Sequence, residues 1–208
     1  MATEAAHDAG TAPGPLPDNL YGDLPDWDFD LWPSSTSMIM AALFLALGFT
    51  VHMQITERID TVITGGLIPL LGIFFFSMWQ MPAGTFYGIT GALIVANINP
   101  IVANLTATNP LAPVFFVPNT LYAVGMALWV SRRKQPGQGI SFRYVAVGHF
   151  LLIPWAVLPV TLIHIFVLQL PTNVVVFWFV VGTLVGYAGL FLAYPFTKKL
   201  LEAGVVQR

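Results

Sequence analysis

Hydrophobic residues fill most of this chain, and charged positions are confined to a few short stretches. Three long runs contain no Asp, Glu, Lys or Arg: Leu31 to Thr56, Thr61 to Ser131 and Tyr144 to Thr197. A membrane-spanning helix needs about 20 mainly apolar residues, and short polar or proline-containing stretches divide these runs into segments of that length. The pattern predicts six spans, at residues 35–54, 62–81, 85–105, 112–131, 144–169 and 174–196.

The composition agrees with an all-α integral membrane protein built as a bundle of six transmembrane helices. The chain is 56% hydrophobic and 9% charged, whereas about a quarter of the residues in a soluble domain are charged. The sequence has no cysteine, which excludes thiolate catalysis, disulfides and cysteine-ligated metal sites. The expected surroundings are the lipid bilayer, and nucleic acid is not an expected partner.

The chain divides into three expected parts. Residues 1–33 hold seven of the ten acidic residues and no Lys or Arg, which predicts a disordered acidic cytoplasmic tail. Residues 34–198 form the transmembrane domain, and residues 199–208 form a cytoplasmic C-terminal tail. Aromatic residues at the end of the acidic part are predicted to anchor the chain at the membrane interface; they are Trp27, Phe29 and Trp32.

Basic residues set the expected orientation in a multi-pass protein of the cell membrane. Arg58 alone falls on one side of the predicted topology, and the other basic residues all fall on the opposite side: Arg132, Arg133, Lys134, Arg143, Lys198, Lys199 and Arg208. Cytoplasmic loops carry an excess of Lys and Arg. Both termini are therefore predicted to be cytoplasmic.

One polar stretch interrupts the longest uncharged run. It reads NINPIVANLTATNPLAP, residues 97 to 113, and irregular backbone at membrane depth is tolerated only inside protein or beside a water-filled cavity. We expect it to form part of a binding site for a small solute, open to the outside. The candidate substrate-binding residues are Asn97, Asn99, Asn119, Tyr122, His164 and Trp178. The alternative is that the polar residues form loops and interhelical hydrogen bonds.

Span one carries a face of small residues, and the sequence carries none of the catalytic motifs that were sought. Ala42 and Ala46 are four positions apart and share a helix face, which lets another helix approach closely, so they are candidate partner contacts. The sequence contains no H-x-x-x-H pair, no G-x-S-x-G and no phosphate-binding glycine loop, and no acidic residue falls inside a predicted span. No enzymatic activity, catalytic residue, metal or cofactor is expected.

The alanine face, the six short spans and the run GITGALIVANINPIVANLTATNPLAPVFFVPNTLYAVGMALWVSRRK together point to a family. They resemble the substrate-binding S-components of energy-coupling factor vitamin transporters, over about residues 35 to 196. The resemblance implies a monomeric vitamin-binding subunit whose outer half binds the solute. It also implies that the alanine face contacts a transmembrane coupling subunit driven by two ATPases.

Two alternatives remain open. SMWQMPAGTFYGIT and GTLVGYAGLFLAY resemble passages of the acetate and succinate channel family, which also has six spans. The signature Asn-Pro-Ala-Pro-Leu-Gly-Leu of that family has no counterpart, because this chain reads WPSSTSM at that place. The other alternative is a non-catalytic subunit of a larger membrane complex, with the small-residue faces as assembly surfaces.

Overall fold

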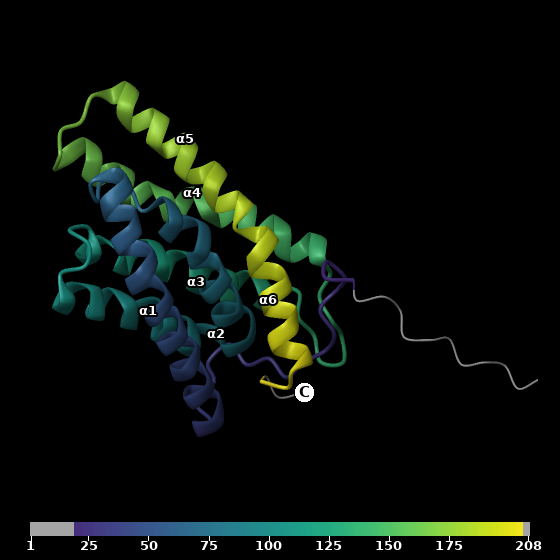
Figure 1. Cartoon of the computed structure of the whole chain (residues 1–208). Coiled ribbons are helices and arrows are strands. Elements are labelled where there is room, and N and C mark those ends of the chain that lie inside the picture. The colour runs from purple at the N-terminus through teal and green to yellow at the C-terminus, as the bar shows by residue number, and fades with distance from the viewer. Residues whose placement is uncertain (1–18, 206–208) are drawn as a thin grey trace, which may run out of the picture.

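The computed structural model describes residues 19–205, and within this range the chain is helical apart from its loops and one isolated β-bridge. Five helical stretches are long and apolar enough to cross a membrane. Figure 1 shows them packed side by side as one bundle. The elements are α1 (Thr36–Thr64), α2 (Leu70–Thr106), the short 3-10 helix η1 (Ala112–Val114), α3 (Phe116–Ser131), α4 (Phe142–Phe166), α5 (Thr172–Ala188) and α6 (Leu190–Glu202).

The sequence predicted six spans, and the structure has five such stretches. The difference lies in α2, which contains residues 70–81 of the predicted second span and all of the predicted third span. The predicted loop at residues 81–84 is helical and buried, and the helical geometry fails only at Tyr87 and Gly88. Gly88 has φ +54°, a conformation that glycine adopts readily. The backbone of Leu31 lies where a side chain at Gly88 would be, and Ile89 N–H donates to the Leu31 carbonyl.

The two halves of α2 run in opposite directions along α1. Before the break, α2 positions 72 and 79 lie against α1 positions 60 and 48. After the break, α2 positions 91 and 99 lie against α1 positions 42 and 57. The chain therefore reverses at Gly88 and covers α1 twice.

The first helix is longer than predicted, because the sequence ITERID continues it instead of forming a loop. Gly65 ends α1 in the left-handed conformation, with φ +66°. Asp60, near this end, is buried and accepts hydrogen bonds from the backbone N–H groups of Leu71 and Gly72, at 2.9 and 2.8 Å. A carboxylate at this place satisfies the free donors of the first turn of α2.

The predicted N-terminal tail differs from expectation over its described part. Residues 1–18 lie outside the described residues, whereas residues 19–35, here called the N-terminal strap, pack across one end of the bundle (Figure 1). Trp27 is buried in a T-shaped contact with Phe86, and the Lys134 ammonium lies over the Trp27 ring. Trp27 is thus a core residue and not an interfacial anchor.

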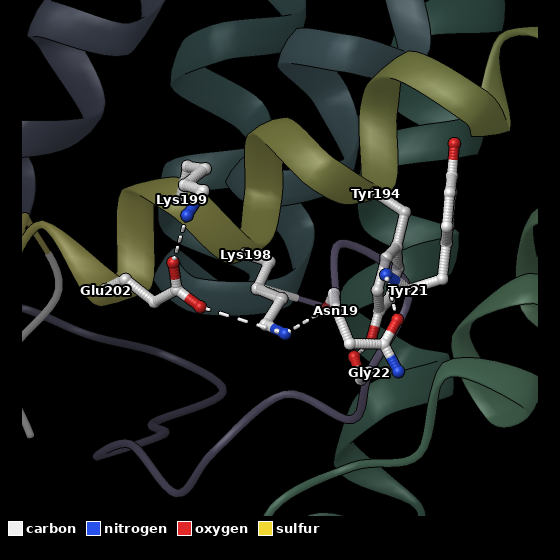
Figure 2. Close-up of polar contacts among 7 residues, drawn as sticks. All are labelled: Asn19, Tyr21, Gly22, Tyr194, Lys198, Lys199 and Glu202. Atoms are coloured by element: carbon white, nitrogen blue, oxygen red, sulfur yellow. Dashed lines mark hydrogen bonds and ion pairs between the residues drawn. The ribbon is translucent and has the colours of Figure 1, made fainter. Parts of the chain in front are cut away.

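Hydrogen bonds join the strap to α4 and α6. The Asp23 carboxylate accepts from Phe142 N–H at the start of α4, and Leu24 pairs with Ile140 in the isolated bridge. Figure 2 shows the contacts with α6: Tyr194 O–H donates to the Gly22 carbonyl, and Lys198 donates to the Asn19 carbonyl. The strap therefore ties together helices that are distant in sequence.

Candidate functional site

A small cavity lies between α1, α2, α3 and α4, at the end of the bundle opposite the strap. We call this end the loop end, because the turns at residues 65–69 and 107–115 cover it. The cavity has a volume of about 50 Å³, which is room for a few water molecules. Its walls are mainly apolar: Phe49, Met53, Ile73, Phe76, Phe115, Val157 and Val160. Three polar side chains also line it: Glu57, Asn99 and Asn119.

Glu57 and Asn99 form a buried pair across the α1–α2 contact. The Asn99 amide Nδ2 donates to Glu57 Oε1 at 3.0 Å, and the two side chains are 1% exposed or less. Thr108 lies next to the same carboxylate. The remaining oxygens of the pair, Glu57 Oε2 and Asn99 Oδ1, are buried without a hydrogen-bond partner of good geometry. Buried polar atoms are normally paired, so each residue of this pair keeps an oxygen with unused accepting capacity beside the cavity.

Asn119 lines the cavity and also makes a hydrogen bond that stabilises the helix packing. Pro100 lacks a backbone N–H, so the carbonyl of Ala96, four residues earlier, loses its usual helical partner. The Asn119 amide donates to this carbonyl across the α2–α3 contact, at 3.1 Å. The sequence predicted that backbone groups freed by prolines need partners. For the Ala96 carbonyl, this partner is the interhelical hydrogen bond from Asn119.

Tyr122 is buried away from the cavity. Its hydroxyl donates to His149 Nδ1 at 2.7 Å, and His149 Nε2 donates to the Gly186 carbonyl at 3.0 Å. Since a carbonyl can only accept, Nε2 carries the proton and Nδ1 is left as the acceptor for the tyrosine. This chain of hydrogen bonds links α3, α4 and α5, and Tyr122 reaches the site only through Phe76, which it contacts edge-on.

Three further predicted site residues lie outside the cavity wall. His164 Nε2 donates to the Leu67 carbonyl at 2.7 Å and so holds the α1–α2 turn. Asn97 is half-buried and donates to the Leu93 carbonyl of its own helix. Trp178 is half-buried on α5 beside Phe177. Of the six predicted residues, the structure brings only Asn99 and Asn119 to the cavity.

The alanine face of α1 packs inside the bundle. Ala42 and Ala46 are both 0% exposed, and the Ala42 methyl lies against Gly91 of α2. The close approach that the small residues allow is used by the second half of α2. The prediction that this face contacts a partner subunit is therefore wrong for the structure described here.

Sequence reasoning missed Glu57 because it placed ITERID in a loop. A signal was present in the spacing. Residues 46, 49, 53, 57 and 60 follow one helix face at intervals of three and four, and all five are buried. Continuing the periodicity of span one would have placed the carboxylate on the same inward face as Phe49 and Met53.

Comparisons with known proteins give one result. No protein-family description matches the sequence, and no curated protein does. A solved structure titled "Crystal structure of an S-component of ECF transporter" superimposes with a TM-score of 0.54 over 82% of this chain and 85% of the other, at 13% identity. The two chains share a fold. The resemblance to S-components expected from the sequence is thus confirmed in the arrangement of the helices.

Proposed function

We propose that the chain is a membrane transport subunit that binds a small solute in the cavity between α1, α2, α3 and α4. The observation that carries the proposal is the pair of buried, unpartnered oxygens on Glu57 and Asn99 in an otherwise apolar cavity. Ionisable and polar groups are costly at membrane depth, and those that occur there commonly serve a bound solute or ion. Apolar walls with a few placed polar groups are also the usual composition of a small-molecule site.

Solute binding on this proposal requires the cavity to widen. About 50 Å³ is too small for a ring-sized molecule. The part of the wall that can give way is the loop end, where Leu111 and Phe115 form a small cluster with Val160, separate from the main core. Movement of residues 107–115 would open the site without disturbing the strap at the far end.

The finer parts of the proposal follow the solved neighbour, whose title describes an S-component of an ECF transporter. By that analogy the solute is a vitamin or a similar molecule, and uptake uses a transmembrane coupling subunit with ATPases. Each half of α2 crosses the membrane, giving six crossings. The strap end, where the basic residues gather, is cytoplasmic, and the loop end faces outward.

The carboxylate of Glu57 also separates this proposal from a channel for acetate or succinate. When ionised, a buried carboxylate without a cationic partner repels an organic acid anion at short range. The channel alternative requires acids to pass or bind beside this group. The remaining alternative, a subunit without a ligand, requires that no solute bind at all.

The test compares two asparagines of the same helix. Asn99→Leu removes the amide of a residue that lines the cavity, whereas Asn97→Leu makes the same chemical change two positions away, outside the cavity wall. The wild-type protein is purified gently, its bound solute is identified by native mass measurement, and binding is measured by calorimetry. We expect the solute to be retained by wild type and Asn97→Leu and lost in Asn99→Leu. Absence of any bound or binding solute in the wild type would refute the proposal.

A further inference from the structure

The lysines and the arginines at the strap end differ in whether they have acidic partners. Each lysine of the chain forms an ion pair with a carboxylate: Lys134 with Asp26 of the strap, and Lys198 and Lys199 with Glu202 (Figure 2). Arg132, Arg133 and Arg143 form no ion pair with any described residue. The positive charge of the strap end that its carboxylates leave uncompensated is therefore carried by these arginines, at the adjoining ends of α3 and α4.

The carboxylates of the strap are engaged or placed elsewhere. Asp26 pairs with Lys134, and Asp23 accepts a hydrogen bond from Phe142 N–H. Asp28 and Asp30 line a hollow beside the start of α1 and the residues that follow α6. An anion bound at the three arginines thus does not have to displace a carboxylate of the strap.

The arginines mark the limits of the apolar part of the chain. Arg132 directly follows the uncharged run that ends at Ser131, and Arg143 directly precedes the run that begins at Tyr144. The three arginines are exposed. The headgroup region of a bilayer begins where the hydrocarbon core ends, so these guanidinium groups lie at the depth of lipid phosphates.

An aromatic pair joins the ends of α3 and α4 and positions one arginine. The rings of Trp129 and Tyr144 stack with centroids 4.8 Å apart. Trp129 Nε1–H donates to the Tyr144 carbonyl at 2.9 Å, and Tyr144 O–H donates to the Trp129 carbonyl at 2.7 Å. The Arg133 guanidinium lies 5.3 Å from the centroid of the Tyr144 ring, and the charge of Arg132 is close to the same tyrosine. Tryptophan and tyrosine are typical of the membrane interface, and a side chain that is ordered beforehand loses less entropy on binding.

Exposed apolar side chains continue from the arginines into the membrane. Leu128 lies one turn before Arg132 on α3, and Val147 and Leu151 lie one and two turns after Arg143 on α4. Their exposed fractions are 43%, 48% and 54%. Residues four apart are neighbours on a helix surface, so a charged group and an exposed apolar surface follow one another on each helix. A phospholipid has the same order of polar head and apolar chain.

We infer that the adjoining ends of α3 and α4 bind an anionic phospholipid of the leaflet at the strap end. The guanidinium groups donate N–H bonds to the lipid phosphate, for which the planar arginine fork is well suited, and the acyl chains lie along Leu128, Val147 and Leu151. A zwitterionic lipid is a weaker match, because its own ammonium group adds positive charge beside the arginines. The site lies at the end of the bundle opposite the cavity and does not depend on a bound solute.

Native mass spectrometry of the full-length protein in neutral detergent tests the inference. Phosphatidylglycerol and phosphatidylcholine with identical acyl chains are added at equal concentration, and the bound copies of each are counted. We expect the wild type to prefer phosphatidylglycerol, and Arg132→Gln combined with Arg143→Gln to weaken its binding by about fivefold for each arginine removed. Lys198→Gln combined with Lys199→Gln is the matched control. It removes as much positive charge from the same end of the bundle, but from side chains that already have a carboxylate partner.

Four results would overturn the inference. The first is equal binding of the two lipids by the wild type, and the second is undiminished binding of phosphatidylglycerol by the double-arginine variant. An equal loss in the double-lysine variant is the third, because it would show that net charge alone attracts the lipid. Displacement of the lipid by glycerol phosphate at the same concentration is the fourth, because it would assign the arginines to a free phosphate compound. If the double-arginine variant does not fold, Arg132→Gln and Arg143→Gln are measured singly, and a lipid preference that neither reduces overturns the inference as well.

Discussion

Replacing Asn119 by leucine removes the donor that the structure assigns to the proline-freed carbonyl of Ala96. Leucine has a similar volume and fits the apolar surroundings, so the main change is a buried carbonyl left without a partner. An unsatisfied buried acceptor costs about 1–3 kcal/mol, whereas interhelical hydrogen bonds in membrane proteins average about 0.6 kcal/mol. We expect Asn119→Leu to lower the free energy of unfolding by about 1–2 kcal/mol.

The assignment can be isolated with a double-mutant cycle. Pro100→Ala restores a backbone N–H that can donate to the Ala96 carbonyl, as in an ordinary helix. In the Pro100→Ala background, the Asn119→Leu substitution should therefore cost clearly less than it does in wild type, giving a coupling energy of about 0.5 kcal/mol or more. Free energies of unfolding are measured by titrating denaturing detergent into mixed micelles while following tryptophan fluorescence. Equal costs in the two backgrounds would show that Asn119 does not act through this carbonyl.

Further predictions concern the strap and the orientation. Trp27→Ala should lower the free energy of unfolding by about 3 kcal/mol, since it empties a buried site; an effect below about 1 kcal/mol in the same detergent titration would mean that the strap is only loosely attached. Hydrogen bonding and charge from Lys134 hold the pKa of Asp26 below its ordinary value of 3.8. The ionised Asp26 therefore stabilises the folded state above that pH, and this stabilisation is lost as the pH falls through the lowered pKa. Thermal melts between about pH 5 and pH 3 should accordingly show a smaller loss of stability in Asp26→Asn than in wild type. Because the chain has no cysteine, single cysteines at Thr108 and Gln138 test the orientation: in intact cells an impermeant reagent should label the first only, and labelling of the second would reverse it.

The helical membrane architecture could be predicted because it depends on long uncharged runs, which are visible in one sequence. The boundaries of the helices could be predicted less well from the sequence. Met81, Pro82, Ala83 and Gly84 look like a loop, yet all four are buried inside α2. A methyl group at Gly84 would lie 2.2 Å from the Ala123 carbonyl oxygen, so this glycine serves helix packing and not a turn. The local sequence does not reveal which of these two uses a glycine has.

The strap shows a second limit. Its acidic, proline-containing sequence is typical of disorder, and no single residue in it predicts docking. The order comes from partners that lie more than a hundred residues away, such as Phe142 for Asp23 and Tyr194 for Gly22. Contacts of this kind are fixed by the tertiary structure and cannot be found from local composition.

Some polar side chains of this apolar chain donate a hydrogen bond to a backbone carbonyl that a proline has left without its helical partner. Asn119 serves Ala96 because of Pro100, and Tyr21 serves Phe191, whose helical donor is removed by Pro195. In both cases the polar side chain follows from the proline and needs no ligand. Glu57 and Asn99 differ, since after their mutual bond each retains a buried oxygen without a hydrogen bond of good geometry. The richness of the region in asparagine and proline therefore does not by itself locate a binding site, because these side chains are also used to satisfy the backbone of the bundle.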